Sequence, residues 1–335
     1  MAITLADAQK NTQDDVQFAV IDEFRKSSWL LDNLTFDDCV NPSGGGATLT
    51  YGYTRLITER GADFRAIGSE YTASDAHRER YTVDLKPLGG SFEIDRVLAD
   101  LGPAASNEVS FQMSQLIKST RARFADEFIN GDTGSDPNGF DGLDVALAGS
   151  STELIPGGAQ MYADWTATGI TDEATAQTAL ELLDTLLSLL DGDPSAILTN
   201  RHGRLRMIAI ARRAGYYTRS EDAFGRPIDG YAGIPIIDMG AKPASSNPII
   251  PIETRDPDGG GEGGNITGLT DIYAVRLGLD GVHGVSVTGS PLVRTWMPDF
   301  TTSGAVKTGE AEMGPCAIVL KATKAAAVLR NVKVQ

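Results

Sequence analysis

The sequence predicts an α+β protein whose extended pieces need support from other elements. Apolar residues recur at three- and four-residue spacing between residues 104 and 130, which is typical of one long helix. From residue 234 onward they occur in short runs bounded by turn residues, which indicates strands. Glycine accounts for 37 of the 335 residues and favours many turns over a compact helical bundle. Helices and strands thus dominate different parts of the chain, as in α+β folds.

Length and composition restrict the class of protein. A chain of 335 residues can hold two domains of ordinary size and a sizeable core. It has no run of 18 apolar residues and no secretory signal at its start, so we expect no membrane partner. The formal net charge of −16 argues against a protein that coats DNA, although not against a container that holds DNA without adhering to it.

The first 45 residues combine a weakly helical acidic stretch, residues 14–26, with an irregular apolar segment. The break at residues 41–46, NPSGGG, separates this segment from the next strand. Its apolar residues are too few to form a core of their own, and such patches usually mark interaction sites. We therefore predict inter-subunit contacts by four residues, with packing against the chain's own body as the alternative: Trp29, Leu30, Leu31 and Leu34.

Residues 47–94 predict a long β-hairpin. Residues 48–53 and 81–85 alternate as strands do, with Phe92 and Ile94 beyond them. The tip, residues 58–80, is polar and mixed in charge. An isolated two-stranded ribbon is marginally stable in water, so a neighbouring subunit is the natural support. The tip arginines are predicted to make inter-subunit contacts: Arg60, Arg65, Arg78 and Arg80.

The helix at residues 104–130 is the clearest element. Its apolar face comprises Val109, Met113, Leu116, Ile117, Phe124 and Phe128. Ser106 or Asn107 can cap its start, and Asn130-Gly131 can end it.

Two glycine- and aspartate-rich loops contain oxygen ligands of the kind that calcium binds. The first, residues 131–150, carries Asp132, Asp136, Asn138 and Asp141. The second, residues 254–264, carries Asp256, Asp258 and Glu262. Neither has the EF-hand spacing, so Asx-type turns are the expected structure and no metal or cofactor is predicted.

The remaining elements follow from similar patterns. We expect helices at 172–190 and 201–213, the second capped by Asn200. Strands are expected at 196–199, 234–237, 271–277, 282–288, 291–297, 316–321 and 326–334.

One basic cluster stands out in this acidic chain. It consists of Arg201, Arg204, Arg206, Arg212 and Arg213, with Arg219 nearby. We interpret it either as a patch that faces DNA inside a container or as a helix face that pairs with carboxylates around a ring of subunits.

No residue pattern predicts an enzyme. His77, His202 and His283 are isolated and lack metal-ligand spacing, and the motifs G-x-S-x-G and G-x-x-x-x-G-K-[ST] are absent. Cys39 and Cys316 are far apart in sequence, so free thiols in a reducing cytosol are the simplest interpretation.

The order of these elements resembles the Hong Kong 97-type major capsid proteins of tailed double-stranded-DNA bacteriophages. The matching segments are residues 128–134 with 137–143, residues 196–200 leading into 205–208, residues 215–217, residues 229–237 with their Gly-Ile-Pro turn, and residues 272–275 with 281–282. Each motif is common by itself, and their order and spacing over nearly the whole chain carry the resemblance.

The resemblance implies a particular division of the chain. It places an N-terminal arm at 1–45, an extended hairpin (E-loop) at 46–90, a peripheral (P) domain with the spine helix at 91–132, an axial (A) domain at 133–285 and the C-terminal P-domain strands at 286–335.

The resemblance also implies partners. They are further copies of the chain in hexamers and pentamers, a portal protein, separate scaffolding and decoration proteins, and packaged double-stranded DNA bound non-specifically. The protein would be located in the virion head, which would be assembled in the host cytoplasm.

Two departures concern maturation. Some relatives carry a scaffolding segment before the arm, whereas this chain starts at the arm, which implies a separate scaffold or earlier cleavage. Some relatives cross-link an E-loop lysine to an asparagine; here the lysine of that region, Lys86, lies at the hairpin base, and Asn331 lies near the C-terminus. We therefore expect non-covalent stabilisation.

The predicted function is an icosahedral shell around a phage genome. Two alternatives stay open: an encapsulin-like nanocompartment that holds protein cargo, and a hydrolase that uses two carboxylates as acid and base. From the arm's lack of a local core we also expect that deleting residues 1–35 leaves a folded subunit that forms no stable shells.

Overall fold

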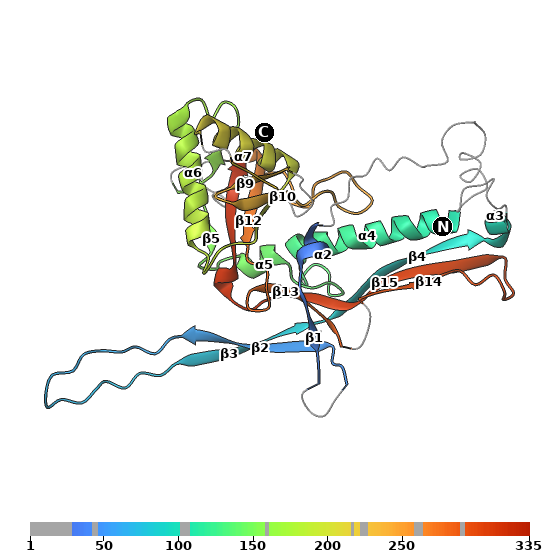
Figure 1. Ribbon diagram of the computed structural model, residues 1–335, viewed down its shortest axis with the longest axis horizontal. Coiled ribbons are helices and arrows are strands. Elements are labelled where there is room, and N and C mark those ends of the chain that lie inside the picture. The colour runs from blue at the N-terminus through green and yellow to red at the C-terminus, as the bar shows by residue number, and fades with distance from the viewer. Residues whose placement is uncertain are drawn as a thin grey trace.

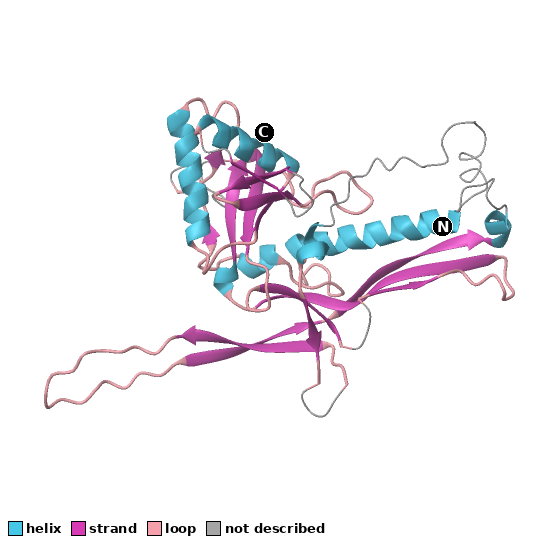
Figure 2. Ribbon diagram, viewed as in Figure 1, coloured by secondary structure: helices cyan, strands magenta, loops and turns pink. Residues whose placement is uncertain are grey.

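The protein is described from a computed structural model that covers residues 29–41, 46–100, 108–157, 161–215, 218–221, 227–257, 264–288 and 292–335. It contains two sheets, a separate two-stranded hairpin and several helices (Figures 1 and 2). The predicted α+β class is confirmed. The predicted helix at 14–26 and the proposed caps Ser106 and Asn107 lie outside these residues.

The first sheet lies beside the long helix α4 (Glu108–Asn130). Its strands are β1 (Phe36–Cys39), β4 (Lys86–Asp95), β13 (Val282–Val287), β14 (Val293–Trp296) and β15 (Val306–Leu320). The strand order is β1-β13-β15-β14, and β4 also pairs with β15. Helix α4 contacts both β4 and β15, and the short α3 (Arg96–Asp100) follows β4.

The second sheet forms a separate lobe with two helices, α6 (Glu173–Ser188) and α7 (Arg201–Arg213) (Figure 1). Its strand order is β5-β16-β12-β7-β10-β9-β8, with β11 paired to β12 and β6 paired to β16. The strands are β5 (Glu153–Leu154), β6 (Ala163–Asp164), β7 (Ala196–Thr199), β8 (Thr218–Glu221), β9 (Pro227–Tyr231), β10 (Ile234–Asp238), β11 (Glu253–Arg255), β12 (Ile266–Val275) and β16 (Ala326–Lys333).

The caps of α6 and α7 explain where these helices begin. Asp172 accepts a hydrogen bond from the Thr175 amide and forms a capping box with it. Asn200 accepts a bond of 2.8 Å from the Gly203 amide, which confirms the predicted cap. A Cβ at Gly203 would collide with Thr199 Oγ1, so any larger residue here would force the buried Thr199 side chain to shift.

The predicted hairpin of 47–94 is wrong in its second half. Only β2 (Thr50–Thr58) and β3 (His77–Asp84) pair with each other, with Tyr53 opposite Tyr81. Residues 86–95 form β4, which pairs with β15 instead. The partner segment, residues 306–313, lies outside the strands that the sequence predicts, because it contains three charged residues and few apolar ones.

The last strand also has a partner far away in sequence. β16 pairs antiparallel with β12, with Tyr273 opposite Val328. The sequence division placed residues 286–335 with the P-domain, but this pairing puts β16 in the second sheet, with β7 and β12. A division by sequence order cannot detect such an exchange between sheets.

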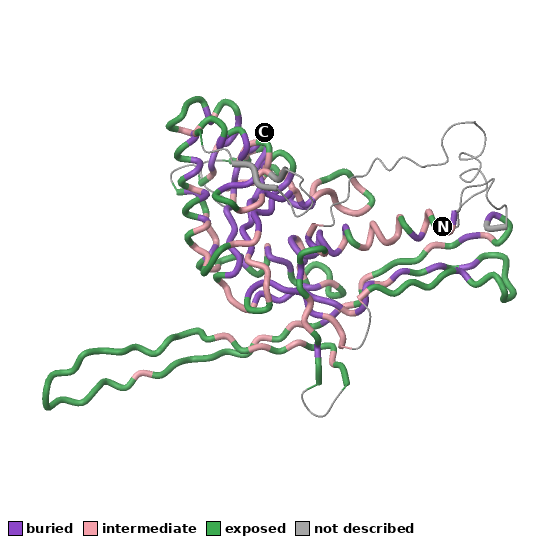
Figure 3. The backbone as a smooth tube through the Cα atoms, viewed as in Figure 1, coloured by how far each residue is buried: buried purple, intermediate pink, exposed green. Residues whose placement is uncertain are grey.

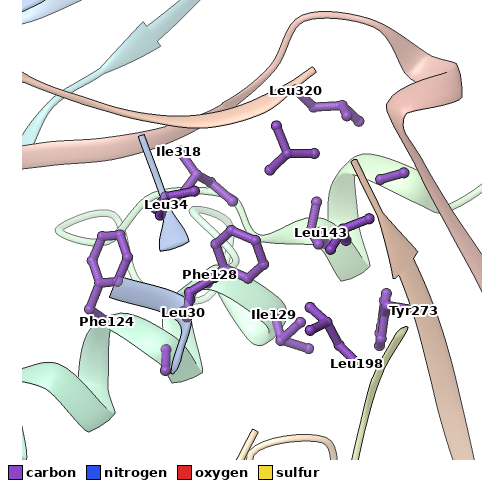
Figure 4. Packing of buried hydrophobic residues seen from close by; sticks show 14 of the residues in the cluster. Leu30, Leu34, Phe124, Phe128, Ile129, Leu143, Leu198, Tyr273, Ile318 and Leu320 are labelled. Atoms are coloured by element: carbon purple, nitrogen blue, oxygen red, sulfur yellow. The ribbon is translucent and has the colours of Figure 1, made fainter. Parts of the chain in front are cut away.

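The main core joins the two sheets (Figure 4). Phe124, Phe128 and Ile129 of α4 are fully buried in it. Ile318 comes from the first sheet and Leu198 from the second, so one core supports both. The first half of α4 is only partly buried, although the sequence predicts one continuous apolar face along it.

Among the described residues, no helix is long and apolar enough to cross a membrane.

Candidate assembly surfaces

The β2–β3 hairpin is fixed to the body by hydrogen bonds at its base. The Tyr53 hydroxyl donates to the Leu320 carbonyl at 3.1 Å. Arg55 donates to the same carbonyl at 2.6 Å and to the Lys321 carbonyl at 3.0 Å. Its guanidinium carbon also lies 4.6 Å from the centroid of the Tyr81 ring. A single arginine thus connects the end of β15 to both strands of the hairpin.

A second set of contacts joins the hairpin to β1. The Tyr51 hydroxyl donates to Asp37 Oδ2 at 2.8 Å, and Lys321 Nζ lies 3.7 Å from the same oxygen. Burial would raise the pKa of Asp37, but the bonds from Tyr51 and the Asp38 amide, together with Lys321, outweigh it and lower that pKa. Asp37 is therefore ionised at neutral pH and holds Tyr51 in place.

The tip of the hairpin projects away from the body without covering (Figure 3). Phe64 and Ile67 are fully exposed, at 108% and 104%, and Tyr71 is 65% exposed. The sequence predicts a polar tip of mixed charge, and this prediction misses the three exposed apolar and aromatic side chains. Phe64 and Ile67, two apolar residues three positions apart in a segment with no strand pattern, are the feature of the sequence that indicates them.

Two of the four tip arginines hold the loop itself. Arg60 Nε donates to the Ser74 carbonyl at 2.8 Å. Arg65 donates to the Ser69 carbonyl at 3.1 Å, and its guanidinium lies 5.2 Å from the Tyr71 ring centroid. Arg78 and Arg80 lie exposed on β3, opposite Leu56 and Thr54. Contacts of these four arginines with another subunit stay a prediction.

The apolar patch of the arm lies partly inside the subunit's own core. Leu30 and Leu34, from α2 (Trp29–Asn33) and the residue after it, are only 3% and 6% exposed and pack with Phe124 and Phe128. Trp29 and Leu31 are half-buried against the same cluster. The expectation that Leu30 and Leu34 form an inter-subunit patch is therefore wrong, because the chain's own helix α4 already covers them.

This packing changes the expected result of truncation. Deleting residues 1–35 removes two core leucines, so we now expect that variant to be destabilised rather than folded. Leu30→Ala and Leu34→Ala should each lower the free energy of unfolding by about 2–5 kcal/mol, as other leucine truncations in cores do. Urea denaturation of the unassembled subunit measures it, and the half-buried Leu31→Ala is the control with a smaller expected loss.

The arginine cluster lies on α7 and is largely engaged within the chain. Arg204 pairs with Asp229 at 2.7 Å, and Arg206 donates to the Val334 carbonyl at 2.9 Å. Arg213 donates to the Ile170 carbonyl. Arg201, Arg212 and Arg213 are exposed. Arg204, Arg206 and Arg213 hold α7 against the second sheet and its neighbouring loop, and a role of the cluster toward DNA or another subunit stays a prediction.

The first acidic loop forms Asx-type turns, as expected. Asp132 accepts bonds from the Ser135 hydroxyl at 2.6 Å and from the Gly134 amide at 2.8 Å, which lower its pKa. Asp136 accepts from the Asn138 amide, and Asp141 accepts from the Thr133 amide and hydroxyl. Of the second loop, Asp258 and Glu262 lie outside the described residues.

A cavity of about 540 Å³ separates the hairpin base from this loop and α5 (Leu143–Leu147). Its lining includes two carboxylates, Asp84 and Asp141. Asp84 accepts a hydrogen bond of 2.8 Å from Thr50, and Asp141 is bound by Thr133. Both carboxylates thus accept hydrogen bonds from threonines of the same chain, as carboxylates with a structural role do. This weakens the hydrolase alternative.

The two cysteines are buried and free. Cys39 lies opposite Val287, and Cys316 lies opposite Ser286, so β13 separates the strands that carry them. Burial raises the pKa of the Cys316 thiol to about 12. Neither thiol is therefore placed to react readily.

Taken together, these elements define a class of fold: a two-sheet body with a long helix and an anchored hairpin whose apolar end is not covered by any of the residues that the structure describes. Solved structures of this class are similar over the whole chain. The capsid of a native GTA particle is 13% identical with a TM-score of 0.59, covering 96% of this chain and 95% of that one. The capsid of Myoviridae phage XM1 is 11% identical with a TM-score of 0.54, covering 98% and 99%.

A third similar structure is the holo-SrpI encapsulin complex from Synechococcus elongatus PCC 7942. It is 17% identical with a TM-score of 0.60, covering 100% of this chain and 98% of that chain. The chain therefore has the Hong Kong 97-type capsid fold that the sequence resemblance implied. No family model matches the chain, and no curated protein matches it.

Proposed function

We propose that this chain is a major capsid protein, which assembles as hexamers and pentamers into the icosahedral head shell around a phage DNA genome. The observation that carries the proposal is the hairpin, held by Tyr51, Tyr53 and Arg55 at its base and bearing fully exposed Phe64 and Ile67 at its tip. A solvated apolar tip on a fixed support is unfavourable in a monomer and suits contact with another copy.

The proposed mechanism is geometric. The first sheet and α4 act as a stiff body, the second lobe packs around the capsomer axis, and the hairpin lies on an adjacent subunit. Each copy then makes several weak contacts at once, and multivalency turns them into a stable shell. In this scheme the sequence-based division is kept, except that β4 (Lys86–Asp95) joins the spine-helix domain and β16 (Ala326–Lys333) joins the lobe that would be the A-domain.

Further partners belong to the same proposal. They are a portal protein, separate scaffolding and decoration proteins, and DNA on the inner face, in a shell assembled in the host cytoplasm. The net charge of −16 suits a wall that encloses DNA without binding it tightly. We propose no catalytic role.

An encapsulin-like compartment is the second candidate, and the similarity to the SrpI encapsulin complex is the observation that favours it. The two candidates share the fold and the assembly principle. They differ in what the shell encloses.

Negative-stain electron microscopy of the overexpressed protein after size-exclusion chromatography tests the proposal, with and without the genes that neighbour it. Closed shells, or rings of six and five, are the expected result. Nuclease-protected DNA inside particles made in infected cells supports the capsid function, whereas protein cargo without DNA supports the compartment. Small discrete particles under every condition would contradict both.

A further inference from the structure

His283 is a buried titratable residue to which the proposed shell function assigns no role. It lies on β13, opposite Val319 of β15, and is 0% exposed. Neither ring nitrogen has a partner of normal hydrogen-bond geometry in the described part of the chain, although the Gly281 backbone lies close enough to interact. Buried polar groups are nearly always hydrogen-bonded, so an unpartnered buried histidine calls for an explanation.

The surroundings of His283 are the same groups that hold the hairpin. Its ring centroid lies 6.0 Å from that of Tyr51, in an edge-to-face arrangement. Lys321 Nζ lies 5.4 Å from the Tyr51 ring centroid. The charged and titratable groups that act on His283 come from every side: Asp37 of β1, Tyr51 of β2, Lys321 after β15 and Asp280 before β13.

This environment favours the neutral ring. Burial, followed by the positive charge of Lys321, lowers the pKa of His283, while Asp37, the Gly281 backbone and Asp280 offset part of the effect. Protonation would place a buried cation near the partly exposed Lys321 and would give the ring two N–H donors, for which the Gly281 backbone is the acceptor close by among the described residues. The structure can relieve that cost by moving one of the elements around the ring.

The hairpin is the element that moves at the lowest cost. β1 and β15 both pair with β13 through backbone hydrogen bonds, so they cannot leave without breaking the sheet. Among the strands that the structure describes, β2 and β3 pair with each other and with no third strand. Their base is joined to the body mainly by side-chain bonds from Tyr51, Tyr53 and Arg55.

We propose that His283 is a pH-sensitive latch for the hairpin: the neutral ring permits the closed base, and the protonated ring releases it. Tyr51 would swing away from β13, admitting water or an acceptor to the imidazolium, while the β2–β3 ladder stays intact. The latch stands on the geometry of one subunit. Only its consequence, a hairpin free to change its angle during shell assembly, rests on the proposed function.

The direction of the effect follows from linkage. Because the closed state holds the pKa of His283 below its ordinary value of about 6.5, protons bind preferentially to the open state. The closed base is thus fully favoured above about pH 6.5. Below that pH the ratio of closed to open base falls about tenfold for each pH unit, until His283 is protonated in the closed state as well.

Double electron–electron resonance on unassembled, full-length subunits tests the latch. Spin labels would be attached at Thr58→Cys on β2 and Gln177→Cys on α6, both exposed positions, while the native thiols stay buried. We expect one distance at pH 7.5 and a second population at pH 5.5. A distance distribution that does not change between these pH values would overturn the proposal.

Variants separate His283 from general acid effects. His283→Leu replaces the titratable ring by an apolar side chain of similar volume and should abolish the second distance population at pH 5.5. If that population persists in a folded variant, the latch is also overturned. The exposed His77→Gln is the matched control and should respond as wild type does. If His283→Leu does not fold, Lys321→Met serves instead: without the neighbouring cation the closed state accepts a proton more readily, so the opening midpoint should move to lower pH, and an unchanged midpoint contradicts the proposal.

These outcomes do not depend on the shell. Subunits whose hairpin opens in acid but which never form particles would support the latch and contradict the proposed function. Shells built from subunits whose hairpin never opens would support the proposed function and contradict the latch.

Discussion

Replacing Phe64 and Ile67 together by serine is expected to abolish shell formation while leaving the subunit folded. Both side chains are fully exposed at the hairpin tip, so their loss costs the monomer nothing in packing. On a neighbouring subunit each would contribute about 1.5–3 kcal/mol by burial. Because every copy in a shell makes this contact, the losses act together on the assembly equilibrium.

Particle yield from size-exclusion chromatography, read with electron microscopy, measures this effect. The control is Phe64→Leu with Ile67→Val, which keeps an apolar tip and should retain shells. Thermal unfolding of the unassembled subunits should be the same for both double variants. Shells of normal yield and heat resistance from the serine variant would remove the tip from the assembly mechanism.

Arg330→Met is expected to cause a large loss of stability in the second lobe. Arg330 on β16 forms ion pairs with Asp144, with Glu153 at 2.8 Å and with Asp271 at 3.2 Å, and its side chain is only 13% exposed. Burial would lower the pKa of Arg330, but Tyr273, Asp271 and Asp144 outweigh it and hold that pKa above its ordinary range. Removing one partner from a buried ion network leaves the others uncompensated and typically costs about 3–5 kcal/mol.

Urea denaturation of the unassembled subunit gives the free energy of unfolding for this variant. Arg201→Met, an exposed arginine at the start of α7, is the matched control and should change stability by less than about 0.5 kcal/mol. An Arg330→Met value indistinguishable from that control would mean that the network is solvated and contributes little.

Local patterns were sufficient where a segment carries its own start and stop signals. The helix α7 begins after the cap Asn200 and ends at Arg213, as expected, because cap and apolar spacing both lie within a few residues. The same holds for α6, β7 and β13. The end of α4 at Asn130 was also predicted correctly, because Gly131 follows it.

Pairing and burial depended on residues far away in sequence. β4 reads as a hairpin continuation until its partner, residues 306–313, is known, and that partner has no strand pattern of its own. Leu30 resembles a surface anchor until Phe124 and Phe128 are seen to cover it. His283 resembles an ordinary isolated histidine until Tyr51 and Lys321 close around it.

The sequence alone therefore determined the α+β class, the main helices, the hairpin and the order of elements that resembles the Hong Kong 97-type capsid fold. These follow from local spacing, caps and turn residues. The tertiary structure alone decided which strands share a sheet, which arm residues are buried, how the hairpin base is held and that Phe64 and Ile67 stay exposed among the described residues. Each of these depends on contacts between residues dozens to hundreds of positions apart, whose energies no local pattern records.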